Sequence, residues 1–331
     1  MNKLTISIAM CSYNGEKYLQ EQLDSIANQS RLPDELIVCD DNSSDKSITV
    51  LERFSASVDF PVLIIKNKDN IGSTNNFEKA ITLCNGDIIA LADQDDVWKS
   101  EKLEAIHDSF DKSPKAGLFF SDANVTDEHM TMTLYRLWEC IGFNFWSRMR
   151  LVNGYAFEVL LHHNIVTGST MAFRSDLKKY ILPIPTHWVH DGWIAIIASA
   201  ISDVTISAVP LIEYRKHLRQ QIGIEKKGMI REYVESKSTK AEGYTLLEDQ
   251  YDDVYQRLDL CSEYFILGKK LNKVRSKIIH LRARADITNN VNKPFGISLS
   301  ELFSLRYFIY SKGFHSFFKD LRNIILNYKE Y

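Results

Sequence analysis

Several features that would assign the chain to a familiar class are missing from its sequence. The five cysteines among 331 residues are widely spaced and form no C-x-x-C pair, which argues against a disulfide scaffold or a zinc cluster and for a reducing compartment. Neither the G-x-G-x-x-G fingerprint nor the G-x-x-x-x-G-K-[ST] phosphate loop occurs. The formal net charge of -3 is close to neutral, so the overall charge gives no reason to expect a nucleic-acid partner.

A long hydrophobic run is also missing. The longest apolar stretch, around WIAIIASAI, is far shorter than the roughly 18 residues that a membrane-spanning helix needs. The N-terminal MNKLTISIAMCSYNG is typical of a strand that ends in a polar turn, and it lacks the apolar core of a signal peptide. We therefore expect a cytoplasmic protein, either free or attached peripherally to the inner face of the cell membrane.

The sequence does contain an alternation of short apolar runs with helical patterns. The runs that indicate strands are residues 4–10, 35–40, 61–66, 87–93 and 116–123. Strands that alternate with helices of this length predict a mainly parallel sheet covered by helices on both faces. From about residue 225 the pattern becomes helical. We predict an α/β catalytic domain over 1–224 and a helical, basic extension over 225–331.

Polar segments follow four of the predicted strands: CSYNG, DDNSSD, NKDNIGSTNN and DQDDVW. In open α/β sheets, ligands bind beyond the carboxyl ends of the strands. An ordinary polar turn explains any one of these segments equally well. Four of them on one rim make a stronger case for a binding site.

Three acids in DQDDVW, namely Asp93, Asp95 and Asp96, directly follow a run that should be buried. Clustered carboxylates in such a place need a cation, and oxygen ligands suit Mg²⁺ or Mn²⁺. The alternative is a solvated turn that caps the next helix, and this explains Asp96 most easily. The residue types alone leave both interpretations open.

Three other motifs contain candidate site residues. Asp40 in CDDNSSD lies nearest its strand and is placed to accept N–H donors from a nucleobase, whereas helix capping accounts for the serines. Asp191 in VHDGW either stabilises a helix N-terminus or acts as a partly desolvated general base. His217 in YRKHLRQQIG belongs either to a solvated basic loop or to a loop that folds over a diphosphate, where it binds metal or phosphate.

Together the motifs CSYNG, DDNSSD, DNIGSTNNF, DQDDVW, VTGSTM, HDGW and YRKHLRQQIG resemble, in this order, family 2 glycosyltransferases with the GT-A fold. The resemblance covers about residues 3–223. It is closest to bacterial enzymes of polysaccharide synthesis, including cell-wall rhamnosyltransferases and O-antigen sugar transferases. It implies a mainly parallel sheet flanked by helices, followed by a C-terminal helical extension. One departure is that the family loop often reads YRQHxxN, whereas this chain has Lys216 and Gln220.

The resemblance also implies roles for residues at matching positions. Expected to bind the donor nucleotide are Ser12, Tyr13, Asn14, Asp40, Asn75 and Asp93. Expected to hold Mn²⁺ or Mg²⁺ are Asp93, Asp95 and His217. Asp191 resembles the catalytic base of the inverting members. Expected on the acceptor or diphosphate side are Asp96, Trp98, Gly168, Ser169, His190 and Arg215.

The reaction implied is inverting sugar transfer from a nucleotide-sugar, dTDP-rhamnose or a UDP-hexose, to a lipid-linked or oligosaccharide acceptor. The expected process is bacterial surface polysaccharide synthesis, of O-antigen, capsule or cell wall. A nucleotidyltransferase or phosphohydrolase that uses the same metal site is the alternative enzyme. A non-catalytic protein is the third reading, and the presence of Asp40, Asp93, Asp95 and Asp191 speaks against it.

The C-terminal part carries an uneven charge. Residues 264–331 contain 13 Lys and Arg against 4 Asp and Glu, an excess of nine positive charges. Within them, SLRYFIYSKGFHSFFKDLRNIIL mixes aromatic and basic residues at helical spacing. This pattern fits an amphipathic helix pair that packs on the catalytic domain, and it fits equally well a peripheral membrane contact through 264–331.

Overall fold

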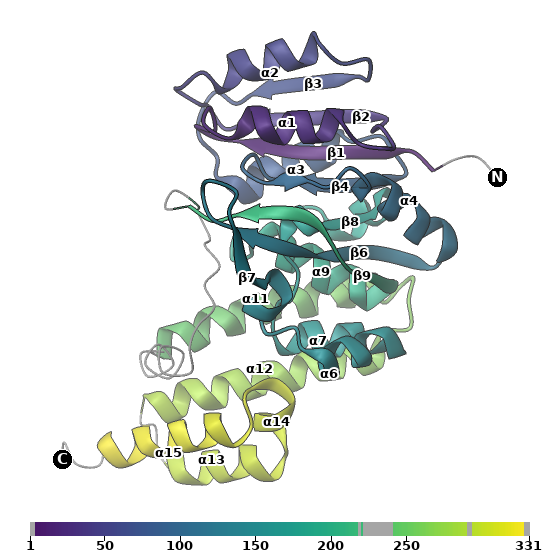
Figure 1. Ribbon diagram of the computed structural model, residues 1–331. Coiled ribbons are helices and arrows are strands. Elements are labelled where there is room, and N and C mark those ends of the chain that lie inside the picture. The colour runs from purple at the N-terminus through teal and green to yellow at the C-terminus, as the bar shows by residue number, and fades with distance from the viewer. Residues whose placement is uncertain (1–3, 218–219, 221–240, 290–292, 328–331) are drawn as a thin grey trace. The chain divides into compact units, whose positions relative to one another are not determined.

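The computed structural model describes residues 4–217, 220, 241–289 and 293–327. The chain divides into two compact units (Figure 1). Unit 1 comprises residues 1–156 and 164–226, and unit 2 comprises residues 157–163 and 227–331. The predicted boundary after residue 224 lies outside the described residues, so it stays a prediction. The short segment 157–163 belongs to the helical unit.

In the described residues, unit 1 contains a sheet of nine strands in the order β3-β2-β1-β4-β8-β6-β9-β5, with β7 paired to β6. The strands are β1 (Ile6–Ser12), β2 (Glu35–Asp40), β3 (Val62–Lys66), β4 (Ile88–Ala92), β5 (Val97–Trp98), β6 (Ala116–Thr126), β7 (Met132–Arg136), β8 (Met171–Arg174) and β9 (Asp203–Arg215). The sheet is parallel from β3 to β4, and β8 then runs antiparallel between β4 and β6. The predicted α/β class is confirmed.

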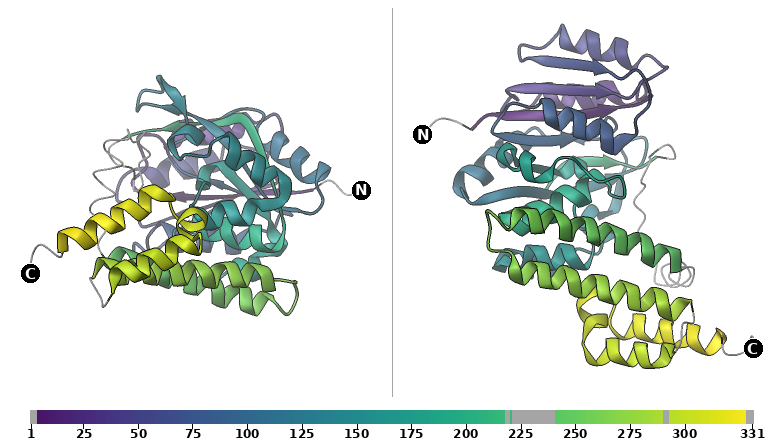
Figure 2. Two further views of the ribbon diagram at one scale, coloured as in Figure 1. Left: turned by 90° about the horizontal axis from the view of Figure 1, so that it is seen from below. Right: turned by 180° about the vertical axis from the view of Figure 1, so that it is seen from behind.

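Helices cover both faces of this sheet (Figures 1 and 2). They are α1 (Leu19–Ala27), α2 (Ser47–Ser55), α3 (Ser73–Leu83), α4 (Lys102–Lys112), α5 (Leu137–Cys140), α6 (Phe145–Arg150), α8 (Lys178–Ile181) and α9 (His190–Ile201), with short irregular turns at Leu151–Tyr155 (η1), Gly168–Thr170 (η2) and Ser175–Leu177 (η3). The apolar stripes of α1, α2 and α4 form one core cluster with alternate residues of β1 and β2. Each fully buried leucine or isoleucine in that cluster contributes roughly 1.5–3 kcal/mol.

The parallel strands end along a common rim. Ser12 at the end of β1 is the register partner of Asp40 at the end of β2, which in turn pairs with Lys66 at the end of β3. Met10 pairs with Ala92, the last residue of β4. The polar segments that follow these strands therefore emerge side by side, as the alternation in the sequence predicts.

Among the described residues, the helices of unit 2 are α7 (Ala156–His162, whose first residue belongs to unit 1), α11 (Ala241–Cys261), α12 (Gly268–Thr288), α13 (Pro294–Phe303), α14 (Arg306–Tyr310) and α15 (Phe314–Asn327) (Figure 2). Its interior contains a paired polar network, in which the guanidinium of Arg284 donates to both carboxylate oxygens of Asp320 at 2.9 Å. Lys277 of α12 donates to the carbonyls of Leu161 and His162 at the end of α7. No helix of the described residues is long and apolar enough to cross a membrane.

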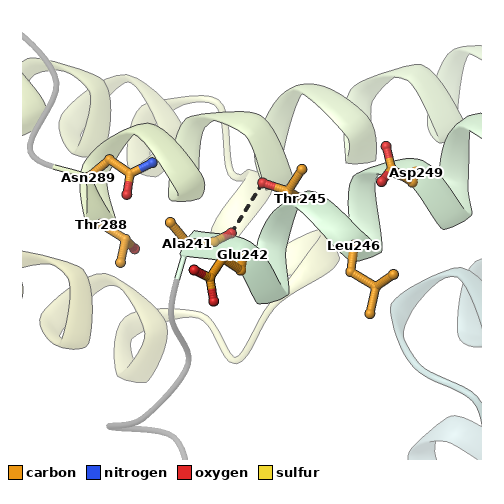
Figure 3. Close-up of a pocket in the computed structure, with 7 residues that line it drawn as sticks. All are labelled: Ala241, Glu242, Thr245, Leu246, Asp249, Thr288 and Asn289. Carbon is orange, nitrogen blue, oxygen red and sulfur yellow. Dashed lines mark hydrogen bonds between the residues drawn. The ribbon is translucent and has the colours of Figure 1, made fainter.

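A pocket of about 690 Å³ lies in unit 2, between the start of α11 and the end of α12 (Figure 3). Its seven lining residues are Ala241, Glu242, Thr245, Leu246, Asp249, Thr288 and Asn289. Ala241 and Asn289 each adjoin a segment that the structure does not describe. The pocket shares no residue with the rim of the sheet, so we assign no function to it.

Candidate active site

The three acids that follow β4 lie in a strongly desolvated position. Asp96 is fully buried, and Asp93 is partly buried. Desolvation raises the pKa of Asp93 well above its ordinary value, and the negative charges of Asp95, Asp96 and Asp191 raise it further. The pKa of Asp96 is raised to about 7 by the same two causes, burial first and the charge of Asp95 second. The carboxylates of the cluster therefore repel one another, and a bound cation would reduce this repulsion.

The end of β9 holds in place the segment 93–96 that contains the three acids, here called the acid loop. The backbone N–H of Arg215 donates to Asp96 at 3.1 Å, and its side-chain Nε donates to the backbone carbonyl of Asp95 at 2.9 Å. His217, just beyond β9, has its Nε2 2.8 Å from Oδ2 of Asp95. The sequence-distant motifs DQDDVW and YRKH thus form one constellation.

Lys102, in the first turn of α4, was not singled out from the sequence, yet it lies in the middle of this constellation. Its side chain is fully buried. The ammonium donates to the carbonyl of Ser169 at 2.6 Å and lies 3.4 Å from the centroid of the Trp98 ring. Burial lowers the pKa of Lys102 well below its ordinary value, although the charges of Asp96 and Asp93 oppose this effect. Lys102 is thus a buried amine that is electrostatically coupled to two of the acids.

Asp191 is in the first turn of α9, where a negative charge is favoured by the helix dipole. Its carboxylate accepts hydrogen bonds from the backbone N–H of Gly168 at 3.2 Å and of Gly192 at 2.5 Å. Desolvation nevertheless raises the pKa of Asp191 to about 6. A carboxylate tuned in this way is ionised at neutral pH and is a stronger base than one in water.

Gly168 and His190 shape the wall beside Asp191. A Cβ atom on Gly168 would lie 2.8 Å from Nε2 of His190, so only glycine fits without displacement. The His190 ring stacks on Phe77 with centroids 4.0 Å apart. Burial lowers the pKa of His190 to about 3, and neither ring nitrogen has a hydrogen-bond partner within the described part of the chain. His190 is therefore a neutral ring that keeps two polar atoms close to Asp191.

The loops after β1 and β2 are tied together by side chains. Asp40 accepts hydrogen bonds from Ser12 at 2.8 Å and from the backbone and side chain of Ser43 at 2.8 and 2.6 Å. The carboxylate of Asp40 thus already serves three protein donors, and its role in nucleobase binding stays a prediction. The neighbouring Asp41, which the sequence left unassigned, accepts from the backbone N–H groups of Ile71 and Gly72.

Tyr13 is the exposed aromatic residue of this rim, with 49% of its surface accessible. Its backbone is fixed by the amide of Gln94, which accepts from Tyr13 N–H at 2.8 Å and donates to its carbonyl at 3.0 Å. Asn14, in a left-handed conformation at φ 47°, accepts from the backbone N–H of Ser44 at 2.9 Å. Asn75 donates to the carbonyl of Ile71 at 2.8 Å. An exposed ring on a fixed backbone suits base stacking.

Within the described residues, no group of three or more His, Cys, Asp and Glu side chains is arranged to hold a metal ion. The chemistry of the donor set nevertheless fits one. Asp93 and Asp95 supply carboxylates, and the buried Oδ2 of the neighbouring Asp96 has at most the hydroxyl of Ser169 as a partner. Mg²⁺ is usually held by one or two carboxylates together with substrate phosphates, so a full set of protein ligands is not required.

The structure therefore brings most of the predicted residues into one site and buries two of them beneath it. Gathered there are Asp93, Asp95, Asp96, Gly168, Ser169, His190, Asp191 and His217. Trp98 lies in the core under Lys102. Arg215 is buried and bonds to the carbonyls of Asp95 and Glu128. Direct contact of Trp98 or Arg215 with a substrate stays a prediction, and their observed contacts support the acid loop from within.

Comparison with known proteins gives a family match. Glycosyl transferase family 2 matches residues 7–181. A dTDP-rhamnosyl transferase, RfbG of Shigella flexneri, is 33% identical over 99 residues, which is 29% of this chain and 34% of that protein. The chain spans about half the length, or less, of the curated relatives that it matches.

Two solved structures resemble the whole chain. One is S. aureus TarS 1-349 in complex with UDP-GlcNAc, with TM-score 0.57 and 15% identity over 97% of this chain and 89% of that one. The other is the mannosyltransferase PcManGT from Pyrobaculum calidifontis in complex with GDP-Man and Mn²⁺, with TM-score 0.50 and 14% identity over 99% and 88%. At these identities the likeness establishes the fold, which is the predicted GT-A fold.

Proposed function

Because the chain belongs to glycosyl transferase family 2, we propose that it transfers a sugar from a nucleotide-diphosphate donor to a hydroxyl group of a saccharide acceptor. The observation that carries the proposal is the convergence of two acidic elements. Asp93, after β4, and Asp191, at the start of α9, are near enough for the charge of one to raise the pKa of the other. The acids after β4 suit the donor diphosphate, and Asp191 suits the acceptor hydroxyl.

The acid loop is the diphosphate side of the proposed site. Asp93, Asp95 and His217 are the candidate ligands of a divalent cation, with the donor phosphates completing the coordination. When bound, the cation would act as a Lewis acid on the diphosphate, whose negative charge grows as it leaves. The presence of Mn²⁺ and GDP-Man in PcManGT supports this assignment. Mn²⁺ and Mg²⁺ both fit the oxygen-rich set.

Asp191 is the proposed general base. Its carboxylate takes the proton of the acceptor hydroxyl while the hydroxyl oxygen forms a bond to the anomeric carbon. The bond from that carbon to the phosphate oxygen breaks, and its electron pair leaves with the nucleoside diphosphate. One displacement with one base inverts the configuration at the anomeric carbon. The N–H groups of Gly168 and Gly192 hold the carboxylate in a fixed orientation.

Two donor classes are supported. The rhamnosyl transferase relative favours dTDP-rhamnose, and the UDP-GlcNAc complex of TarS favours a UDP-hexose. The exposed ring of Tyr13 accommodates thymine and uracil equally, because stacking does not depend on the base. We propose bacterial surface polysaccharide synthesis as the process and a lipid-linked saccharide as the acceptor.

The test is an assay of the purified full-length chain with dTDP-rhamnose and UDP-hexoses, each with EDTA and with added Mn²⁺. A glycosyltransferase releases nucleoside diphosphate and couples that release to a glycoside whose anomeric configuration NMR can assign. Release of nucleoside monophosphate would indicate a phosphohydrolase, and consumption of a nucleoside triphosphate with release of pyrophosphate would indicate a nucleotidyltransferase. Either outcome without glycoside formation would overturn the proposal.

A further inference from the structure

The last helices of unit 2 expose an unusual amount of large apolar surface. Phe314, Phe318 and Ile325 lie on α15 at spacings of four and seven residues, so they share one side of the helix. Phe308 of α14 packs edge-on against Phe314 with ring centroids 4.9 Å apart, and Phe314 lies 6.2 Å from Phe318. We call these four residues the aromatic face. Each is between 43% and 59% exposed.

The residues of the aromatic face are not needed to complete the hydrophobic core of unit 2. The opposite sides of the same helices are already packed, with Tyr307, Phe317 and Ile324 buried. Gly313, at φ +55°, makes the turn that places Phe308 beside Phe314. A Cβ at Gly313 would lie 2.8 Å from the Phe308 ring. The turn therefore brings two exposed rings together while the inner residues keep their own contacts.

The exposed charges in the stretch that carries the aromatic face, residues 293–327, have one sign. The only acids between residues 293 and 327 are Glu301 and Asp320, and both are buried. Asp320 is paired with Arg284, and Glu301 contacts His280 and Arg306. The exposed charged residues of the same stretch are Lys293, Lys312 and Arg322, all of them basic. Arg322 follows Phe318 by one helical turn and so borders the aromatic rings.

We propose that the aromatic face docks on the surface of an anionic lipid bilayer. Aromatic rings and short aliphatic side chains enter the headgroup boundary, and a rim of cations attracts acidic lipid. A second copy of the chain fits less well, because a symmetric contact would bring Lys312 and Arg322 toward their own equivalents. The proposed docking is interfacial. It does not depend on the proposed transfer reaction.

The experiment is flotation of the full-length chain with two kinds of vesicle, phosphatidylcholine alone and phosphatidylcholine mixed with phosphatidylglycerol. The intact chain should float with the anionic vesicles and remain at the bottom with the neutral ones. Phe314→Ser/Phe318→Ser should reduce the bound fraction. Lys312→Glu/Arg322→Glu should reduce it roughly tenfold or more, since each basic residue near an anionic surface contributes to binding.

Leu260→Ser/Ile266→Ser is the matched control, because these two side chains are also exposed apolar residues of unit 2, 68% and 104% accessible. It should float as the intact chain does. Far-UV circular dichroism and the melting temperature verify that each variant is folded. Point variants are preferable to a truncation after residue 263, which would remove Lys277 and with it the bonds to the end of α7.

Three outcomes would overturn the docking proposal. One is equal flotation with neutral and anionic vesicles, and another is unchanged flotation of both aromatic-face variants. The third is a lack of vesicle binding combined with an aromatic-face variant that shifts the sedimentation coefficient from oligomer to monomer. That third result would show that the aromatic face is an interface between two copies of the chain in an oligomer. Nucleotide-sugar turnover with a soluble acceptor, measured in parallel, should be the same for all variants.

Discussion

The ammonium group of Lys102 donates a hydrogen bond to the backbone carbonyl of Ser169 at 2.6 Å. The residue before Ser169 is Gly168, whose N–H donates to Asp191. Lys102 also interacts electrostatically with Asp93 and Asp96, whose charges raise its pKa against the larger lowering by burial. A single buried side chain therefore connects the acid loop after β4 with the turn that orients the proposed base.

We predict that Lys102→Met lowers the free energy of unfolding by about 3 kcal/mol, because it removes the buried amine that bonds to Ser169 and interacts with the charges of Asp93 and Asp96. The loss of the bond to Ser169 should also loosen the turn at Gly168. Since the Gly168 N–H lowers the pKa of Asp191, the acid limb of the rate profile should move to higher pH. Urea unfolding and the pH dependence of kcat/KM test the two parts separately.

Lys112→Met is the control for Lys102→Met, since Lys112 also lies in α4 but forms an exposed pair with Asp108 at 2.7 Å. Exposed pairs of this kind contribute little to stability. An acid limb at the same pH in Lys102→Met and in the intact chain would reduce Lys102 to a purely structural residue.

Asp191→Asn should retain donor binding and lose transfer by roughly 10²–10⁴-fold, because the amide cannot accept the proton of the acceptor hydroxyl. In the intact chain, transfer should fall as the pH drops through about 6, where the carboxylate becomes protonated. Nucleotide-sugar titration by calorimetry and product formation by chromatography measure the two properties. Asp176→Asn, an exposed acid in a short helical turn, serves as the control and should transfer normally.

The same substitution should stabilise the fold. Folding raises the pKa of Asp191 from 3.8 to about 6, so the ionised carboxylate destabilises the folded chain above pH 6. This cost disappears as the pH falls through 6 toward 3.8, because the carboxyl is then protonated in both states. At pH 7, Asp191→Asn should raise the free energy of unfolding by roughly 1–3 kcal/mol. Thermal melts of both proteins at pH 7 and pH 4 test this, and an equal difference at both would contradict it.

The sequence was sufficient to predict five of the nine strands of the described sheet, together with the rim, because both follow from local alternation. Apolar runs and the polar segments after them identify where parallel strands end, and the structure places those ends together. The burial of Lys102 was not predictable in this way. In KSEKLEAI it occupies a position typical of a solvated helix surface, and only the distant Ser169 and the ring of Trp98 make its buried site favourable.

Tertiary pairing also changes the picture of Asp40. In the sequence it is the acid nearest the apolar strand and looks available to a ligand. The register partner of Asp40 is Ser12 of β1. Ser12 and Ser43 together donate three hydrogen bonds to the carboxylate of Asp40. The inclusion of residues 157–163 in unit 2 was equally hidden, because the bonds from Lys277 join positions more than 100 residues apart.

Removal of divalent cations should abolish transfer and should weaken donor binding. EDTA treatment followed by added Mn²⁺ or Mg²⁺ should restore both. Asp95→Ala should raise the Mn²⁺ concentration needed for half-maximal rate, since it removes a proposed ligand and also the contact between Asp95 and the ring of His217. Asp108→Ala, on the exposed side of α4, is the control. Full transfer in EDTA would rule out the metal.

Gly168→Ala tests the close approach that forms the wall of the site. The added methyl group would lie 2.8 Å from Nε2 of His190 and 3.7 Å from Cβ of Asp191. Both neighbours are held, His190 by stacking on Phe77 and Asp191 by the start of α9. The turn must therefore move, and the Gly168 N–H loses its alignment with the carboxylate of Asp191. Overpacking of this kind costs about 1–3 kcal/mol of stability.

The kinetic consequence of Gly168→Ala should appear in kcat rather than in donor affinity. The displaced groups orient the base, whereas the donor is expected to bind at the loops after β1, β2 and β4. Gly268→Ala is the matched control, because a Cβ at Gly268 meets nothing within 4 Å. That control should be neutral or slightly stabilising, by up to about 1 kcal/mol. Weaker donor binding with an unchanged kcat in Gly168→Ala would move this turn to the nucleotide side of the site and separate it from Asp191.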